Sequence, residues 1–513
     1  MIRRLDNVKL SVSRPESDLL DIAKRKLGAP VKYFTIIKKS LDARDKRNLF
    51  WLYSIAFSES DEREGERVFG QVKNPPAVAV IGGGPAGLFC AVRLIEHGFK
   101  PIIIERGERV EERRKTCLNF FENRILNAES NVQFGEGGAG AFSDGKLNTR
   151  TKDGLNKDVL QTFVRFGAPE DVAYLNKPHV GSDRLYGVLI ALRKFVEERG
   201  GKYLFNTKFT GFTTSGGALD GLLLSDVRTG REYEKKCGCA VLAVGHSARD
   251  TYEMLYSNGV KMEARDFAVG VRIEHLAGDI SRAQYGDGAR YLPNADYQLV
   301  SHAHERTAFT FCMCPGGVVI PAASEEGGVV VNGMSNRARD AVNSNSALMV
   351  QMRREDFGGD DIFAGVRFQR KLERAAFVAG GENYRAPCQL LGDFLKDRLS
   401  DKFGEVKPTY AAGVTFSRLD GVLPPVVCAA LRASVPDMAR RLKCFDSASA
   451  VLTGVESRFS SPVKIIRGED GQSVTVGNLY PCGEGSGYSG GITSSAADGM
   501  KIAELIYSRY ANL

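Results

Sequence analysis

A glycine-rich turn between two apolar runs constrains the fold of this chain more than any other feature. Gly82-x-Gly84-x-x-Gly87 follows the apolar run 78–81 and opens a helical stretch, and a second apolar run, 102–104, comes after it. The first glycine permits a tight turn, the second lets the backbone approach a pyrophosphate, and the third lets helix and strand pack closely. The spacing therefore predicts a strand–turn–helix–strand unit that binds an ADP moiety.

Residues around the turn extend this prediction. Glu105 directly follows the second apolar run, where a carboxylate that binds ribose hydroxyls belongs. Ala91 and Gly98 continue the small-residue pattern along the helix. The phosphates would lie at the helix N-terminus, because free N–H groups and the helix dipole favour anions there. A lone motif says little in a chain with 56 glycines, but the complete unit indicates a Rossmann-like domain.

Length and composition set the broad class of protein. At 513 residues the chain exceeds one ordinary core, which predicts two or three domains. The polar N-terminus lacks the apolar stretch of a signal peptide, and no uninterrupted apolar run is long enough to cross a bilayer. The ten cysteines lack Cys-x-x-Cys spacing, which indicates reduced thiols rather than disulfides or zinc. We therefore expect a cytoplasmic protein with no metal site and no membrane segment.

The first 74 residues predict a small α+β module. Through residue 75 the chain carries an excess of five positive charges, out of a formal net charge of +8. A solvated surface of mixed charge is the expected reading. The alternative is a basic module that recruits RNA through Lys38, Lys39, Arg44 and Lys46. Apolar periodicity places its elements as a strand at 8–13, a helix at 17–27 and strands at 33–40 and 49–57, followed by a charged linker at 58–66 and 74–76.

The rest of the chain leaves the nucleotide-binding pattern and returns to it. After a glycine-dense loop at 134–146, a helix at 183–200 and a strand at 202–206 continue the α/β pattern. Three alternating stretches, at 209–214, 219–227 and 231–235, predict a β-meander, and 240–245 reads as a buried strand. Strand-like runs follow at 309–311, 318–320 and 328–331, then a long polar interval, and finally a strand at 479–482, a glycine loop at 483–491 and a helix at 492–507.

Three positions spaced along the chain specify FAD among the dinucleotides. They are the ADP unit, Gly245 at the end of a buried strand, and Gly483-Glu484 after the last strand. This arrangement resembles flavoproteins of the glutathione reductase and hydroxybenzoate hydroxylase type. The resemblance implies that Glu484 contacts the ribitol or pyrophosphate and that the last helix points its N-terminus at the flavin. The expected cofactor-binding residues are Gly82, Gly84, Pro85, Ala86, Gly87, Glu105, Arg106, Gly138, Gly140, Lys146, Gly245, Gly483, Glu484, Gly490, Gly491 and Ile492.

A closer resemblance extends over nearly the whole chain. The strings NVQFGEGGAG (131–140), FSDGK (142–146), FCMCPGG (311–317), GVESR (454–458), YPCGEGSGY (480–488) and KKSLDAR (38–44) carry it. They are similar to a bacterial family of predicted FAD-dependent, or NAD(FAD)-utilizing, dehydrogenases. The predicted fold is α/β: a discontinuous Rossmann-like FAD-binding domain with an inserted β-meander at 75–269 and 450–513, and a mixed α+β cap or substrate domain at 270–449, preceded by the α+β module at 1–74.

Three residues are the candidates for catalysis, each with a structural alternative. Arg458 could clamp a substrate carboxylate or make an internal salt bridge. Lys146, with Asp144 nearby, could face the flavin or the substrate, or belong to a surface turn. His275 could donate a proton to a substrate that accepts hydride. His179, His302 and His304 share this possibility, although a single histidine is more often part of the structure.

The cysteines predict no redox centre. Cys312-Met-Cys314 reads as a pair of small core residues, with a redox role as the alternative, and Cys237-Gly-Cys239 leads into a buried strand. A flavin-facing dithiol of the Cys-x-x-Cys kind is therefore not expected. A second GxGxxG after a strand is also missing, so NAD(P)H, if it reacts, enters the open flavin cleft transiently.

The sequence thus predicts an FAD-dependent oxidoreductase that transfers hydride between flavin N5 and an unidentified organic substrate. A small molecule is the expected partner, with NAD(P)H as a transient second one, and neither nucleic acid nor membrane is expected. Two alternatives stay open: an RNA-associated flavoprotein that uses the basic N-terminal module, and a flavin-loaded sensor without turnover.

Overall fold

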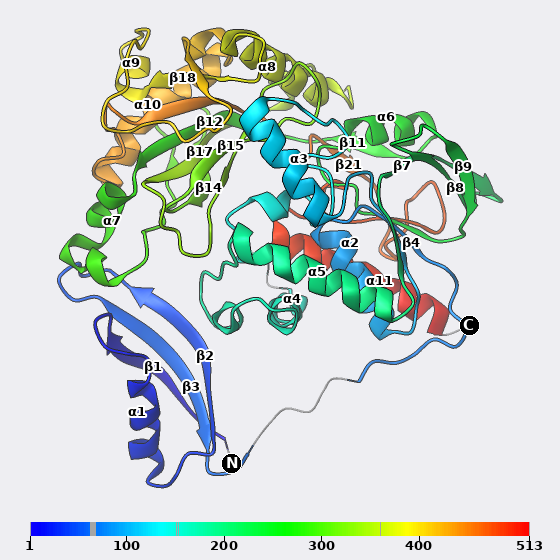
Figure 1. The fold of residues 1–513 in the computed structure, drawn as a ribbon, viewed down its shortest axis with the longest axis horizontal. Helices are drawn as coiled ribbons and strands as arrows, with labels where there is room; N and C mark the ends of the chain where they lie inside the picture. The colour runs from blue at the N-terminus through cyan, green and yellow to red at the C-terminus, as the bar shows by residue number, and fades with distance from the viewer. Residues whose placement is uncertain (1, 62–67, 150, 152, 360, 512–513) are drawn as a thin grey trace.

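The computed structural model describes residues 2–61, 68–149, 151, 153–359 and 361–511 and has three parts (Figure 1). A small N-terminal module lies at the lower left of Figure 1, a seven-stranded sheet lies above it, and a parallel sheet with its helices fills the right half. The predicted α/β class, with a Rossmann-like sheet and an inserted meander, is confirmed.

The N-terminal module is a three-stranded antiparallel sheet, β1-β3-β2, with one helix. Its apolar core includes Leu10 of β1, Leu19 of α1 and Phe57 of β3. These side chains lie on the side of the sheet that faces the helix and on the side of the helix that faces the sheet. The predicted order of strand, helix, strand and strand is confirmed, whereas 62–66 of the predicted linker lie outside the described residues. The elements are β1 (Arg3–Ser11), α1 (Asp18–Leu27), β2 (Tyr33–Asp42) and β3 (Phe50–Ser58).

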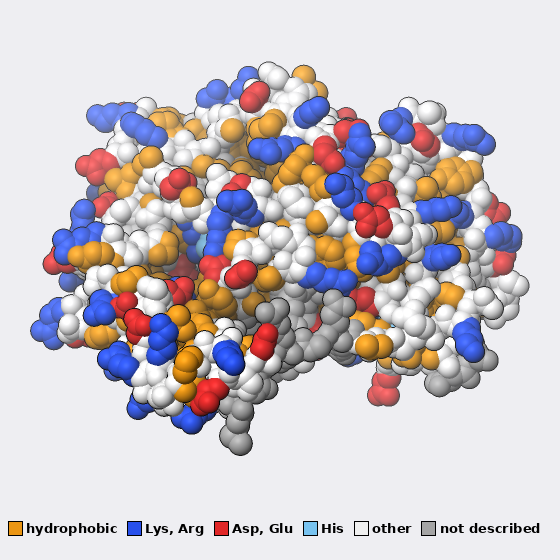
Figure 2. Space-filling model, turned by 60° about the horizontal axis from the view of Figure 1, so that its bottom comes forward, with side chains coloured by type: hydrophobic (Ala, Val, Ile, Leu, Met, Phe, Trp, Pro, Cys, Tyr) orange, Lys and Arg blue, Asp and Glu red, His pale blue; other side chains and the backbone are white. Residues whose placement is uncertain are grey.

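Most of the basic side chains of this module already have partners. Lys39 Nζ lies 3.0 Å from a Glu16 carboxylate oxygen, and Arg44 lies 2.7 Å from Asp42. Lys46 Nζ donates to the main-chain oxygen of Ala283, 2.6 Å away. On the face drawn in Figure 2, Lys and Arg side chains are interspersed with Asp and Glu side chains. The surface is therefore one of mixed charge.

The second part is a parallel sheet of order β22-β10-β4-β5-β6. Successive residues of its strands face opposite sides: Val80 and Val241 belong to the core beneath the helices, whereas Leu242 packs under the meander. The strands are β4 (Ala79–Ile81), β5 (Ile102–Ile104), β6 (Lys202–Leu204), β10 (Ala240–Leu242) and β22 (Leu479–Pro481). The flanking elements are α2 (Pro85–Glu96), α3 (Val110–Asn123), α4 (Leu155–Arg165), α5 (Ser182–Glu198), α6 (Arg249–Ser257), α11 (Ile492–Ala511) and the meander β7 (Thr207–Ser215), β8 (Ala218–Asp226) and β9 (Glu232–Lys236).

The third part is a sheet of order β13-β14-β17-β12-β20-β18-β19. Its centre is the antiparallel pair β12 and β17, which runs from Phe267 opposite Met352 to Leu276 opposite Asn343. The strands are β12 (Phe267–Leu276), β13 (Val300–Ser301), β14 (Ala308–Cys314), β17 (Asn343–Met352), β18 (Ala386–Leu390), β19 (Val414–Phe416) and β20 (Val451–Glu456). Around it lie α7 (Ala277–Tyr285), α8 (Ala364–Gly380), α9 (Leu391–Leu395), α10 (Pro425–Arg441) and the pairs β15 (Val318–Pro321) with β16 (Val331–Met334) and β11 (Met262–Ala264) with β21 (Val463–Ile465).

Two details of this part differ from the sequence prediction. β20 hydrogen-bonds β12 and β18, so the seven-stranded sheet continues through Glu456 and the predicted boundary at 450 falls one strand too early. The interval after residue 331, read as polar, contains β17, α8 and α10. β17 begins with Asn343 and Ser344, which are buried although polar, so hydropathy hides the strand.

Candidate cofactor and active site

A large cavity of about 970 Å³ lies where the carboxyl ends of the parallel strands face the seven-stranded sheet. Its volume is at the upper end of the usual range for ligand sites. Of the predicted cofactor-binding residues only Gly87 does not line it. The lining includes Gly82, Gly84, Pro85, Ala86, Glu105, Arg106, Gly138, Gly140, Lys146, Gly245, Gly483, Glu484, Gly490, Gly491 and Ile492.

The turn between β4 and α2 presents bare backbone to this cavity. Gly82 has φ +107°, and a Cβ there would lie 2.2 Å from the main-chain oxygen of Ala243. A Cβ on Gly87 would lie 2.0 Å from the oxygen of Gly82, so this glycine lets α2 pack against the turn. A Cβ on Gly84 would meet nothing closer than 3.8 Å, so that side is open. The first N–H groups of α2 therefore remain accessible to an anion.

Glu105 is held rigidly at the end of β5. Its carboxylate accepts hydrogen bonds from the backbone N–H groups of Gly83 at 2.7 Å, Gly107 at 2.9 Å and Gly135 at 2.9 Å. The residue is 5% exposed, and its side chain lines the cavity. A carboxylate has about four acceptor positions, so one is left for a ribose hydroxyl. This geometry fits the role that the sequence predicts for Glu105.

The glycine loop is held from inside by Arg113, which sequence reasoning missed. The guanidinium is fully buried and donates to five main-chain oxygens of the loop. Burial lowers the pKa of Arg113, which the neighbouring carboxylates of Glu105 and Glu136 partly offset. The sequence contained one signal of this role. Arg113 lies four residues before Cys117 and therefore on the same, buried face of α3, where a positive side chain is unusual. The acceptors are the oxygens of Asn131, Val132, Gly135, Glu136 and Gly138.

The loop after β22 and the N-terminus of α11 line the cavity next to the start of α2, because a Cβ on Gly483 would lie 2.7 Å from the Ala86 side chain. Glu484 lines the cavity, and its carboxyl group has no hydrogen-bond partner among the described residues. Burial raises the pKa of Glu484 to about 7. A Cβ on Gly490 or Gly491 would meet nothing within 4 Å. An unpartnered acid and an open helix N-terminus fit a ligand with hydroxyls and developing negative charge, as FAD has.

The lining on the side of the seven-stranded sheet includes three phenylalanines and Lys146. The Phe459 ring packs edge-on against Phe311 and Phe309, with centroid separations of 4.5 Å and 5.5 Å. Lys146 Nζ hydrogen-bonds the main-chain oxygen of Met313, and no carboxylate within the described chain pairs with it. Asp144, in contrast, is 1% exposed and is bound by Arg339. Its role is therefore to stabilise the loop, which was the structural alternative for this residue.

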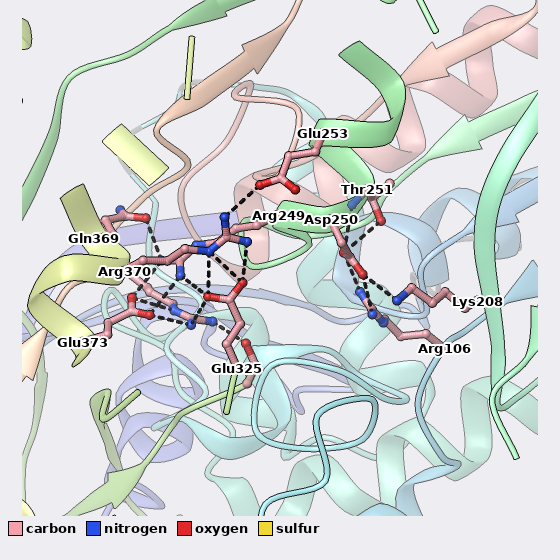
Figure 3. A network of polar contacts seen from close by, with 12 residues as sticks. Arg106, Lys208, Arg249, Asp250, Thr251, Glu253, Glu325, Gln369, Arg370 and Glu373 are labelled. Atoms are coloured by element: carbon pink, nitrogen blue, oxygen red, sulfur yellow. Dashed lines mark hydrogen bonds and ion pairs between the residues drawn. The ribbon is translucent and has the colours of Figure 1, made fainter. Parts of the chain in front are cut away.

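Arg458 and Arg106 line the cavity, but both have internal partners. Arg458 binds both carboxylate oxygens of Glu373, at 3.1 Å and 2.9 Å, so the structural alternative, an internal salt bridge, describes it. Figure 3 shows Glu325 between Arg249 and Arg370, and Asp250 between Arg106 and Lys208. Arg106 binds both oxygens of Asp250, at 3.0 Å and 2.8 Å. These arginines join secondary-structure elements and leave little of the guanidinium free for a ligand.

The histidines are distributed differently from the prediction. His275 is 2% exposed in β12, and Nε2 lies 2.9 Å from the main-chain oxygen of Phe445, outside the cavity. This position contradicts the catalytic role predicted for it. His179, His302 and His304 do not line the cavity either. His246, which sequence reasoning missed, does line it, directly after Gly245, and burial lowers its pKa to about 4, so it is neutral at pH 7.

Within the described part of the chain, no helix is both long and apolar enough to span a bilayer. No cluster of three or more His, Cys, Asp or Glu side chains suited to a metal occurs among those residues either.

Comparison with known proteins places this geometry in a class. Residues 77–116, which hold the β4–α2 turn and β5, match the family model of an FAD binding domain. Residues 266–459, which hold the seven-stranded sheet, match the model described as FAD-dependent protein, C-terminal domain-like. Because flavin carries redox chemistry into the proteins that bind it, the class is that of the FAD-dependent oxidoreductases.

A relative specifies the family. An uncharacterized protein of Clostridium beijerinckii is 44% identical over 512 residues, which cover 98% of this chain and 95% of the relative. The chain belongs to the family of FAD-dependent proteins that this relative represents.

Solved flavoprotein structures are more distant. Glycerol-3-phosphate dehydrogenase from Bacillus halodurans is 11% identical at a TM-score of 0.37, covering 86% of this chain and 65% of that one. Glycine oxidase from Bacillus cereus is 11% identical at a TM-score of 0.33, covering 85% of this chain and 95% of that one.

Proposed function

We propose that this protein transfers hydride between flavin N5 and a small or medium organic substrate. One observation carries the proposal: the same cavity is lined by the ADP-type turn, Glu105 and the α11 N-terminus and by three phenylalanines and Lys146, which has no carboxylate partner among the described residues. FAD supplies the hydride acceptor and donor when it is bound. The chain binds the cofactor, stabilises its charge and contacts the substrate.

Each of the first three features has a defined task in this proposal. The free N–H groups of the α2 N-terminus bind the pyrophosphate, and the remaining acceptor position of Glu105 binds a ribose hydroxyl. The N-terminus of α11, at Ile492, opens into the same cavity, where it would stabilise negative charge on a reduced flavin. Its fixed dipole stabilises that charge without reorganising.

The three phenylalanines and Lys146 favour a substrate with an apolar body and an acidic group. Phe309, Phe311 and Phe459 offer ring faces and edges to the apolar part. Lys146 is the cation we assign to a substrate carboxylate, because within the described ranges its amino group has only a neutral partner. We therefore propose organic acids as the substrate class.

NAD(P)H is the second candidate electron partner. No second nucleotide-binding turn occurs in the sequence, so NAD(P)H would react from the open cleft without a domain of its own. The ten free thiols are consistent with a reducing compartment, and we propose a cytoplasmic location.

Anaerobic spectroscopy tests the proposal. The yellow holoprotein is mixed with NADH, NADPH and a panel of hydroxy, amino and unsaturated acids, and flavin absorbance is followed. We expect bleaching by at least one compound, with release of an oxidised product. Lys146→Met should raise KM for that acid at least tenfold and leave bound FAD unchanged, whereas Lys464→Met, on β21, should change neither. Bleaching without product release would favour the sensor, and copurified RNA that high salt removes would favour the RNA-associated alternative.

A further inference from the structure

The chain has two Cys-x-Cys pairs in contrasting surroundings. In Cys237-Gly-Cys239 both residues are buried in apolar cores outside the cavity, and the Cys237 thiol donates to the Cys239 main-chain oxygen at 3.1 Å. Burial raises the pKa of Cys239 to about 12, so this thiol stays protonated. This pair is inert by position and provides a matched control.

Cys312 and Cys314 instead lie at the cavity. The register of β14 shifts between Phe311 and Cys314, and Cys312 has φ +42°, so the strand bulges at this point. Cys312 is half-buried and lines the cavity, whereas Cys314 is fully buried behind it. The Cys314 thiol donates to the Cys312 main-chain oxygen at 3.3 Å, so Cys314 packs against the residue that lines the cavity. The two cysteines are therefore neighbours, and one of them lines the cavity.

Cations surround this pair. Arg272, fully buried on β12, donates to the Cys312 main-chain oxygen at 2.9 Å and pairs with Glu456 at 2.6 Å. Lys146 binds the main-chain oxygen of Met313, the residue between the two cysteines. The two carbonyl groups between Cys312 and Cys314 are thus each bound by a positive side chain.

These groups favour the thiolate of Cys312. The hydrogen bond from Cys314 is the main cause that lowers the pKa of Cys312 to about 6. The positive charges of Arg272 and Lys146 lower this pKa further, whereas burial and the nearby Asp144 raise it. Two further acids feel its charge: Glu456 and Glu484 each have a pKa raised to about 7, mainly by burial and in part by Cys312. A thiolate beside a second thiol is the reactive form of a dithiol.

We propose that Cys312 and Cys314 form a dithiol–disulfide couple that exchanges two electrons with the flavin in the same cavity. The inference rests on the proposed function, because it requires FAD there. In the oxidation, the Cys312 thiolate and the Cys314 thiol form one S–S bond while the Cys314 S–H bond breaks. The proton and both electrons pass to oxidised FAD, which becomes FADH⁻. Reduced flavin cleaves the disulfide by the reverse step, so the loaded protein stores four electrons.

An anaerobic dithionite titration of the air-oxidised holoprotein tests this. Wild type should consume two equivalents per FAD for complete reduction, and Cys312→Ser and Cys314→Ser should each consume one. Cys237→Ser, the matched control, should still consume two. A value of one equivalent for the wild type would overturn the couple and leave the proposed function intact, whereas a protein that binds no FAD would overturn both.

A measurement on the wild type alone guards against variants that fail to fold. One sample of the air-oxidised holoprotein and one sample reduced with dithionite are denatured and alkylated. The mass of the peptide that contains both cysteines is then measured by mass spectrometry. We expect no label before reduction and two labels after it. Two labels in both states would overturn the proposal.

Discussion

Arg113 offers the sharpest test of how the glycine loop is held in place. Arg113→Met removes the guanidinium from a site where it is fully buried and donates to five main-chain oxygens between Asn131 and Gly138. Methionine fills similar apolar volume but donates nothing. Lysine keeps the charge but has a single nitrogen, so it cannot reach the same set of acceptors.

The size of the effect follows from these bonds. The oxygens of Gly135 and Gly138 keep backbone N–H partners, so among the described residues three acceptors lose their only protein donor. A buried acceptor left without a partner costs about 1–3 kcal/mol, which gives roughly 3–9 kcal/mol as an upper limit for these three. Water can enter the vacated space, so the range for breaking one buried charged network, about 3–5 kcal/mol, is the better expectation. For a domain of this size that corresponds to a fall in Tm of roughly 10 °C.

The assay reads stability and flavin binding together. Gln133, Phe134 and Gly138 of the loop line the cavity, so its disorder should also weaken FAD binding at least tenfold. Thermal unfolding and titration of the flavin-free protein with FAD measure the two effects. Arg114→Met is the matched control, because Arg114 is exposed on the same helix. Unchanged Tm and FAD affinity in Arg113→Met would refute the reasoning.

Three further predictions concern other parts of the structure. Gly87→Ala should yield little folded, flavin-bound protein, since the new Cβ would lie 2.0 Å from the Gly82 oxygen; Gly278→Ala, with nothing within 4 Å, should be neutral in expression and flavin content. Burial alone would raise the pKa of Glu373, but two arginines hold it well below its usual range, so its stabilising contribution is present near neutral pH and lost on acidification. Glu373→Gln should lower Tm at pH 7, and its difference from wild type should narrow toward about pH 3; a constant difference would contradict this. His275→Gln should alter Tm but neither FAD content nor any substrate-induced bleaching, and loss of bleaching with FAD retained would restore a catalytic role.

The local part of the site could be predicted from the sequence. The β4–α2 turn depends on glycines whose tasks are set by neighbouring backbone, so Gly82 and Gly87 could be interpreted from spacing alone. The return of the chain to the FAD-binding domain at Gly483-Glu484 was also recognisable, because a glycine-rich loop follows a buried strand there. Cavity-lining positions fixed by backbone geometry were therefore predictable.

The distant partners could not be predicted. Glu373 binds Arg249 and Arg458 from far along the chain, and nothing in residue spacing states which cation an acid meets. His275 was misjudged because a histidine on a strand has the same pattern whether it faces a core or a cavity. Cys312 was read as a core residue because the bulge that turns it toward the cavity has no signature of its own.

Identification of the cofactor in the purified protein tests the central claim most directly. The protein is denatured, and the released chromophore is separated and weighed by mass spectrometry, with its amount compared with that of the chain. We predict one FAD per chain, bound without a covalent link and reduced reversibly by dithionite. A protein that carries no flavin, and that takes up none when incubated with FAD, would contradict the assignment of the cavity.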